Sequence, residues 1–248
     1  YRYDMYTVGS TRKMLSDAVK QIPVRVIIGG WSSLDKRPST EIMTAIDEMR
    51  NAGIEILHYN PTRKLYDDAG NKYPYYECCD EIESVKTRLK EIDTYWPGDG
   101  IFFDNGPFSA EPSNIAFYKE LYDYTQENHG PRTTVFNPSR HYKLDISEYM
   151  KWTNFNMMDF ESTYTNWKKA LTDGTLETNT NVWKNAGYLP KRFSMIVEKV
   201  DTIEEAKDII NTATTMNFGS FYITDKSYDE FPSYFVELVE YISKINSQ

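Results

Sequence analysis

The sequence predicts a single (β/α)8 barrel of the TIM type over residues 1–248. Three observations predict this fold. Short apolar runs alternate with segments of helical periodicity, which indicates a parallel sheet. Eight such strand–helix units fit into 248 residues, a usual length for this barrel. No shift in composition marks a second domain, and we find neither a low-complexity segment nor an internal repeat.

Runs rich in apolar, β-branched or aromatic residues are the expected strands. The run at 100–103 is continuously apolar after its glycine, which suits a strand buried on both faces. In chain order the expected strands cover residues 3–8, 24–28, 54–59, 100–103, 133–136, 154–160, 193–197 and 219–224.

The segments after these strands repeat apolar residues every third or fourth position, the period of a helix with one buried face. Ser39 is expected to cap one helix, and Thr202 with Glu205 forms a capping box for another. The expected helices cover 11–22, 39–53, 77–95, 114–128, 146–152, 164–171, 202–216 and 233–245. We assign no helix to the polar stretch at 172–181.

Composition and charge exclude several classes of partner. The formal charge is −9, without the clustered Lys and Arg of a nucleic-acid footprint. No run of about twenty apolar residues is available to span a membrane. The two cysteines, Cys78 and Cys79, are adjacent, a poor geometry for a disulfide, and too few for a zinc site. We therefore expect no metal and no cofactor.

The expected strands place two acids where barrel enzymes carry out their chemistry, at the carboxyl ends of the strands. Asp104 directly follows strand 100–103, and Glu161 follows strand 154–160. The two acids are two strands apart, so they could face each other across the barrel mouth. The alternative for Asp104 is that it only caps the next turn, as Asp often does.

Other polar and aromatic residues at the strand ends are candidate substrate-binding residues. Aromatic side chains offer a flat apolar face on which a sugar ring can stack, and the chain has 20 Tyr. The candidates are Trp31, His58, Tyr59, Asn137, Asp159, Tyr164, Thr224 and Asp225.

Paired carboxylates in an aromatic-rich cleft fit glycoside hydrolysis, in which one acid protonates the leaving oxygen and the other is nucleophile or base. The same acids could instead hold Mg²⁺ or Ca²⁺ through oxygen ligands. Aromatic residues rather than further acids accompany the pair, which favours the hydrolase.

Several segments resemble the spherulin-4 family, which includes glycoside hydrolases acting on galactosamine-containing polysaccharides. Each match is short, and they run in order over nearly the whole chain. The main ones are Gly100-Ile101-Phe102-Phe103-Asp104, Val135-Phe136-Asn137-Pro138, and Asp159-Phe160-Glu161 with Tyr164 and Trp167. Looser matches are Tyr59 with Thr62 and Tyr66, and Tyr222-Ile223-Thr224-Asp225 before Phe231-Pro232-Ser233-Tyr234.

The resemblance implies a (β/α)8 barrel and an endo-acting glycosidase for a polymer of galactosamine and N-acetylgalactosamine, with the functional acids at Asp104 and Glu161. It also implies a secreted or cell-surface protein. The chain begins at Tyr1 without a Met or an apolar leader, so we expect any signal or anchor to lie outside it.

The chain departs from the family pattern at one position. The family has Asp-Glu where this chain has Asp104-Asn105. Asn cannot exchange a proton, although it can bind a substrate. Four alternatives follow. Asp104 and Glu161 suffice as the pair, or a substrate acetamido group acts as nucleophile, with Asn105 or Asp104 orienting it and Glu161 as the acid. Otherwise the barrel binds carbohydrate without cleaving it, or Asn105 was introduced to trap a complex.

Overall fold

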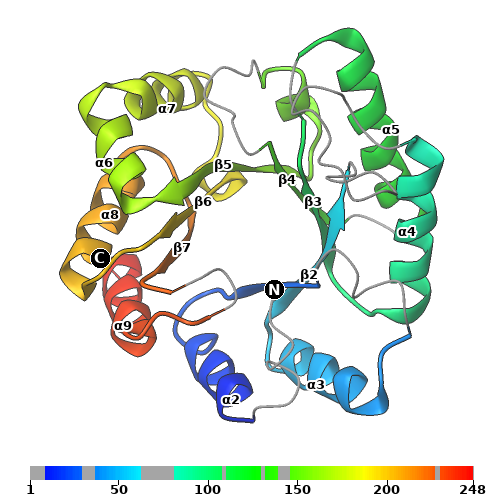
Figure 1. Ribbon diagram of the computed structural model, residues 1–248, viewed down its shortest axis with the longest axis horizontal. Coiled ribbons are helices and arrows are strands. Elements are labelled where there is room, and N and C mark those ends of the chain that lie inside the picture. The colour runs from blue at the N-terminus through cyan, green and yellow to red at the C-terminus, as the bar shows by residue number, and fades with distance from the viewer. Residues whose placement is uncertain are drawn as a thin grey trace, which may run out of the picture.

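The computed structural model describes residues 9–29, 37–62, 81–107, 110–129, 132–138, 146–226 and 230–247. Within these residues, seven strands form one parallel sheet in the order β1-β2-β3-β4-β5-β6-β7. The sheet curls, and the helices surround its outer face (Figure 1). This arrangement confirms the α/β class with a parallel sheet. The expected strand at 3–8 lies outside the described residues.

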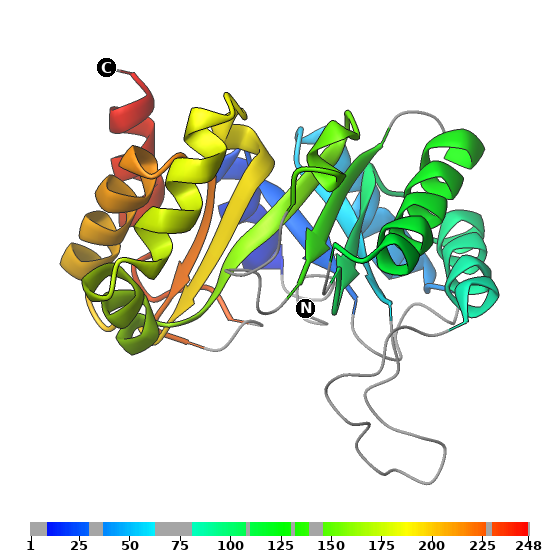
Figure 2. The same cartoon turned by 90° about the horizontal axis from the view of Figure 1, so that it is seen from above.

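The seven strands agree with the last seven expected from the sequence. Each pairs in parallel with its neighbour in the chain, so all their carboxyl ends lie at one edge of the sheet (Figure 2). The strands are β1 (Arg25–Ile28), β2 (Glu55–Pro61), β3 (Gly100–Asp104), β4 (Thr133–Asn137), β5 (Phe155–Thr163), β6 (Phe193–Glu198) and β7 (Ser220–Thr224).

The helices follow the expected order. Ser39 accepts a hydrogen bond from Ile42 N at the start of α3, and Thr202 and Glu205 form the expected capping box of α8. The helices are α2 (Gly9–Ala18), α3 (Thr40–Asn51), α4 (Ile82–Tyr95), α5 (Pro112–His129), α6 (Tyr164–Thr172), α7 (Thr175–Asn185), α8 (Ile203–Thr215) and α9 (Phe235–Asn246). Short 3-10 turns are η1 (Tyr149–Lys151) and η2 (Pro190–Arg192).

Helix α7 corrects our interpretation of the polar stretch at 172–181. Its buried residues Leu176, Thr180 and Trp183 recur at helical spacing, and Trp183 stacks on Phe193 with ring centroids 4.5 Å apart. These three residues form a narrow buried stripe that packs the helix against the core, while polar residues dominate its composition. The expected helix at 146–152 is the shorter turn η1.

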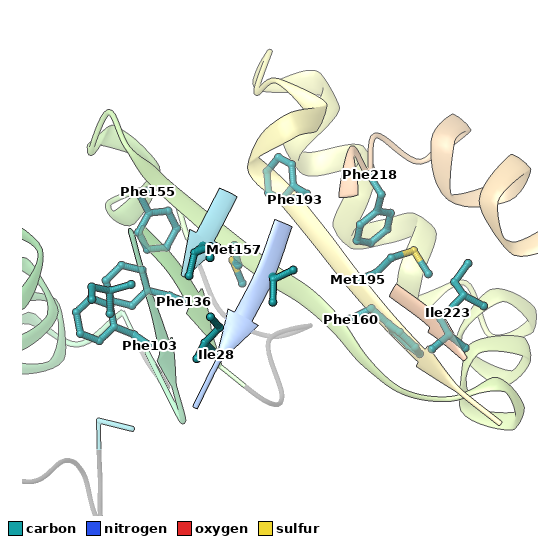
Figure 3. Close-up of a cluster of buried hydrophobic side chains, with 14 of the residues drawn as sticks. Ile28, Phe103, Phe136, Phe155, Met157, Phe160, Phe193, Met195, Phe218 and Ile223 are labelled. Atoms are coloured by element: carbon teal, nitrogen blue, oxygen red, sulfur yellow. The ribbon is translucent and has the colours of Figure 1, made fainter. Parts of the chain in front are cut away.

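Side chains alternate between the two faces of the curled sheet. The outer face packs against the helices in a large aromatic core, where Phe136 stacks between Phe103 and Phe155 at centroid distances of 4.8 and 4.9 Å (Figure 3). The inner face forms a smaller cluster made of Leu57, Tyr59, Phe102, Val135, Met158 and Ile196. Every second residue of a strand shares a face, so Asp104 and Asn137 follow Phe102 and Val135 on the inner face.

A bulge in β5 changes which residues face inward. The pairing of β5 with β6 shifts register between Met158 and Phe160. Met158 belongs to the inner cluster, whereas Phe160 belongs to the outer core and packs against Trp167 at 5.1 Å. The extra residue, Asp159, therefore resets the alternation and returns Glu161 to the inner face.

Within the described ranges, no helix has the length and apolar character that crossing a membrane would require.

Candidate active site

Asp104, the last residue of β3, accepts hydrogen bonds from three side chains. Tyr59 Oη donates to Asp104 Oδ2 at 2.5 Å, and Asn105 Nδ2 donates to the same oxygen at 2.9 Å. Asn137 Nδ2 donates to Asp104 Oδ1 at 2.9 Å. Three side-chain donors stabilise the ionised carboxylate, whereas a carboxylate that only caps a turn binds backbone N–H groups of that turn.

Glu161 meets Asp104 through the same amide. Asn137 Nδ2 also donates a hydrogen bond to Glu161 Oε2. Because both carboxylate oxygens bind one nitrogen, they lie within about 6 Å of each other, twice a hydrogen-bond length. The structure thus brings together the two acids that the sequence places two strands apart.

Asn105 occupies the turn after β3 in a left-handed conformation, with φ of 63°. Asn is one of the few residues besides Gly that adopt this region readily. Its side chain is buried, and its amide is committed to Asp104. Asn105, at the position where the sequence resemblance implies a Glu, therefore supports the neighbouring carboxylate as a hydrogen-bond donor.

Two residues that we did not propose for the site hold this turn. Thr62 Oγ1 lies 2.9 Å from Asp104 O and 3.1 Å from Asn105 O, and it also contacts the Tyr118 hydroxyl at 2.9 Å. Tyr118 comes from α5 and is fully buried. Gly106 passes so close that a Cβ there would lie 1.5 Å from Tyr118 Oη. The sequence shows the glycine but does not indicate which side chain approaches it.

His58 lies away from the acid pair. It is buried on the outer face near Trp96, and its Nε2 is 3.0 Å from Pro97 O, before the amino end of β3. Burial lowers the pKa of His58 to about 4, so the ring is neutral at neutral pH. The sequence places it only three residues before the end of β2, but strand alternation turns it toward the helices. The structure does not bring it to the candidate site.

Asp159 forms the bulge and is completely buried. Desolvation raises the pKa of its carboxyl well above the ordinary value. A side chain with no exposed surface is not placed to contact a polysaccharide.

The remaining candidates are dispersed. Tyr164 begins α6, and desolvation together with Glu205 and Asp208 of α8 raises its pKa, so it faces that helix. Thr224 is buried and accepts a hydrogen bond from Lys226 N at 2.9 Å.

Asp225 directly follows β7. It accepts hydrogen bonds from Ser233 N at 2.9 Å and forms an ion pair with Lys226 Nζ at 3.3 Å. Burial alone would raise the pKa of Asp225, but these hydrogen bonds outweigh it and lower the pKa. Trp31, our proposed stacking residue, lies outside the described residues.

Over the described part of the chain, no three or more His, Cys, Asp or Glu side chains gather as a metal site would require. Cys78 and Cys79 lie outside that part.

A curled parallel sheet with helices around its outer face defines an α/β protein, and an acid–amide cluster of Asp104, Asn105, Asn137 and Glu161 lies at the carboxyl edge of that sheet. Residues 12–242 match the family model Spherulin4, described as spherulation-specific family 4. The chain belongs to this family, which confirms the resemblance found in its sequence motifs.

One solved structure shares the fold over almost the whole chain. It is the crystal structure of Aspergillus clavatus Sph3 in complex with GalNAc. The TM-score is 0.72 at 18% sequence identity, with 96% of this chain and 94% of that chain covered. No curated protein matches the sequence.

Proposed function

We propose that this protein is a glycoside hydrolase that cleaves within a polysaccharide of galactosamine and N-acetylgalactosamine, outside the cell or at its surface. The observation that carries the proposal is the pairing of Asp104 and Glu161 through Asn137. Membership of the Spherulin4 family supports the substrate class, as does the binding of GalNAc by the structurally similar Sph3.

The contacts of Asp104 suggest how the two acids divide their roles. Its three hydrogen-bond donors favour the carboxylate anion, which suits the nucleophile or base. Glu161 is then the acid that protonates the glycosidic oxygen as the bond to the anomeric carbon breaks. Asp104 or the substrate acetamido group attacks that carbon, and water later releases the product and restores both protonation states.

The closeness of the acids favours retention of configuration. Retaining enzymes place their carboxyl groups about 5–5.5 Å apart, and inverting enzymes about 6.5–9.5 Å apart to admit a water. Two oxygens that share one donor, within about 6 Å, leave little room for that water. An acetamido nucleophile would also retain configuration, so the spacing alone does not choose between these two.

The second candidate is a carbohydrate-binding barrel without turnover. The observation that favours it is Asn105, a neutral side chain where the family pattern has Glu. In that case the carboxyl edge of the sheet would bind the same amino-sugar polymer, and Asp104 would contribute hydrogen bonds only.

Mass spectrometry of oligosaccharides released from partly deacetylated poly-N-acetylgalactosamine tests both candidates. We expect release by the unaltered chain, loss of release in Asp104→Ala, and full release in the control Asp173→Ala, which changes an exposed acid after α6. Binding without release by the unaltered chain, with release restored in Asn105→Glu, would favour the second candidate. Release that survives in Asp104→Ala would contradict the assigned site.

We also propose that residues 3–8 supply the eighth strand and complete one barrel domain over 1–248. A cavity of about 250 Å³ lies between β1 and β7, the terminal strands of the sheet. Apolar side chains line it, among them Val26, Phe221 and Val239. Leu15 of α2 lines it too, and α2 begins at Gly9, directly after the proposed strand.

A further inference from the structure

Asn137 is held in place by the main chain of β3 and of the turn that follows it. It ends β4, is 2% exposed, and is the register partner of Asp104 in β3. Its carbonyl accepts a hydrogen bond from Gly106 N at 2.9 Å. An amide in such a position has little freedom to move toward a ligand.

The chemistry of its two neighbours determines the orientation of the amide. Asn137 Nδ2 contacts two carboxylate oxygens, Asp104 Oδ1 and Glu161 Oε2. Carboxylates only accept hydrogen bonds, so the NH₂ end must face them, and its two N–H groups match the two acceptors. A sugar hydroxyl could bind this nitrogen only by displacing one of the acids.

We propose that Asn137 is a positioning residue whose single amide sets the spacing of Asp104 and Glu161 and offsets the repulsion between them. This inference rests on the proposed hydrolase function, and it replaces our expectation that Asn137 binds sugar. Two half-buried carboxyl groups within about 6 Å repel each other when both are ionised, and a donor shared between them stabilises the anionic form of each.

Among the residues that the structure describes, few titratable side chains lie around this amide. Asp104 reaches it from β3 and Glu161 from β5, and Tyr59 of β2 donates to Asp104. The next acid along the strand ends is Glu198 of β6, the register partner of Thr163. Removing the amide should therefore act first on the Asp104–Glu161 pair.

The test compares Asn137→Ala and Asn137→Ser with a matched control, Asn156→Ala. Asn156 lies on β5, and its Nδ2 also makes two hydrogen bonds, to Thr134 O at 3.2 Å and Asn154 O at 3.0 Å. These partners are neutral carbonyls near the amino ends of the strands. The control loses two amide hydrogen bonds of the same kind without touching the acids.

The primary measurement is a ¹³C NMR titration of the side-chain carboxyls, assigned with Asp104→Asn and Glu161→Gln. Without the shared donor, both anions lose stabilisation, so the apparent midpoints of the pair should rise by about one pH unit in Asn137→Ala. Asn137→Ser, which keeps one donor, should give a smaller rise. Asn156→Ala should leave the midpoints unchanged. Unchanged midpoints in folded Asn137→Ala, or in Asn137→Ser should the alanine variant not fold, would overturn the inference.

Kinetics on the amino-sugar polymer give the second measurement. We expect kcat to fall about 10- to 100-fold in Asn137→Ala, because the variant loses hydrogen bonds to charged groups. KM should stay nearly constant. The bell-shaped pH profile should move to higher pH on both limbs. A rise in KM with kcat unchanged would return Asn137 to sugar binding and overturn the inference. If the midpoints rise but the unaltered chain releases no product, the positioning role stands and the hydrolase proposal fails.

Discussion

Met158 and Glu161 both face the inside of the curled sheet, although Glu161 comes three residues after Met158 in β5. In a regular strand, residues three apart point to opposite faces. The register shift between Met158 and Phe160 absorbs one residue, so Phe160 turns outward and Glu161 inward. The acid reaches Asn137 only because of this bulge. The residue that makes the bulge, Asp159, is itself buried.

Asp159→Asn should stabilise the protein at neutral pH. Burial raises the pKa of Asp159 in the folded state well above its ordinary value, so the folded protein holds this proton more tightly than the unfolded chain. The contribution of Asp159 to stability is therefore full below about pH 4 and declines as the pH rises toward the folded-state pKa. Asn has the same shape and no charge to desolvate.

We expect Tm of Asp159→Asn to exceed that of the unaltered protein at pH 7 and the difference to shrink toward pH 4. Scanning calorimetry between pH 4 and 8 measures it. Asp201→Asn, at an exposed acid before α8, serves as the control and should show no such trend. A lower Tm for Asp159→Asn at pH 7 would mean that the charged carboxylate stabilises the bulge.

Tyr59→Phe should lower activity more than stability. The change removes one of three donors to Asp104 and keeps the ring, which stacks on Phe102 with centroids 6.0 Å apart. Loss of a hydrogen bond to a charged group corresponds to roughly a 10-fold fall in kcat/KM. Tyr241→Phe is the matched control, because its hydroxyl contacts Asn211 at the surface. Equal losses in both variants would argue against a role for the Tyr59 hydroxyl at the site.

Gly106→Ala should destabilise the fold by several kcal/mol, since overpacking of a tight core contact costs about 1–3 kcal/mol or more. The new Cβ would lie 1.5 Å from Tyr118 Oη and 2.3 Å from its Cζ. For that reason Tyr118→Phe, which keeps Cζ, should not rescue the alanine variant. Urea denaturation gives the free energy of unfolding. Gly9→Ala, where a Cβ meets nothing within 4 Å, should change it little, and a tolerated Gly106→Ala would contradict the packing described here.

If residues 3–8 complete the barrel, deleting residues 1–8 should lower Tm by many degrees. The deletion would leave the apolar side chains of that cavity in contact with water. Circular dichroism melting of the truncated and full chains measures the difference, and dye binding to exposed apolar surface should rise in the truncated form. Identical melting would refute closure by this segment.

The order of elements is predictable because each strand and helix carries its own periodicity. All seven described strands were expected from short apolar runs such as 193–197, and the caps at Ser39 and Thr202 from local side-chain chemistry. Helix α7 was missed because its buried stripe is too narrow to dominate a polar composition. Of the candidate site residues, Asp104 and Glu161 come together in the structure, while His58 does not join them.

The sequence by itself determined the fold class, the family, and which residues end the strands, since these depend on local pattern and short motifs. Only the tertiary structure decided which of those residues meet. A one-residue bulge sets the face of Glu161, and strand alternation turns His58 outward. The contact that joins Asp104 to Glu161 runs through Asn137 on the strand between them. Such contacts depend on register and side-chain direction across neighbouring strands, which no single stretch of sequence encodes.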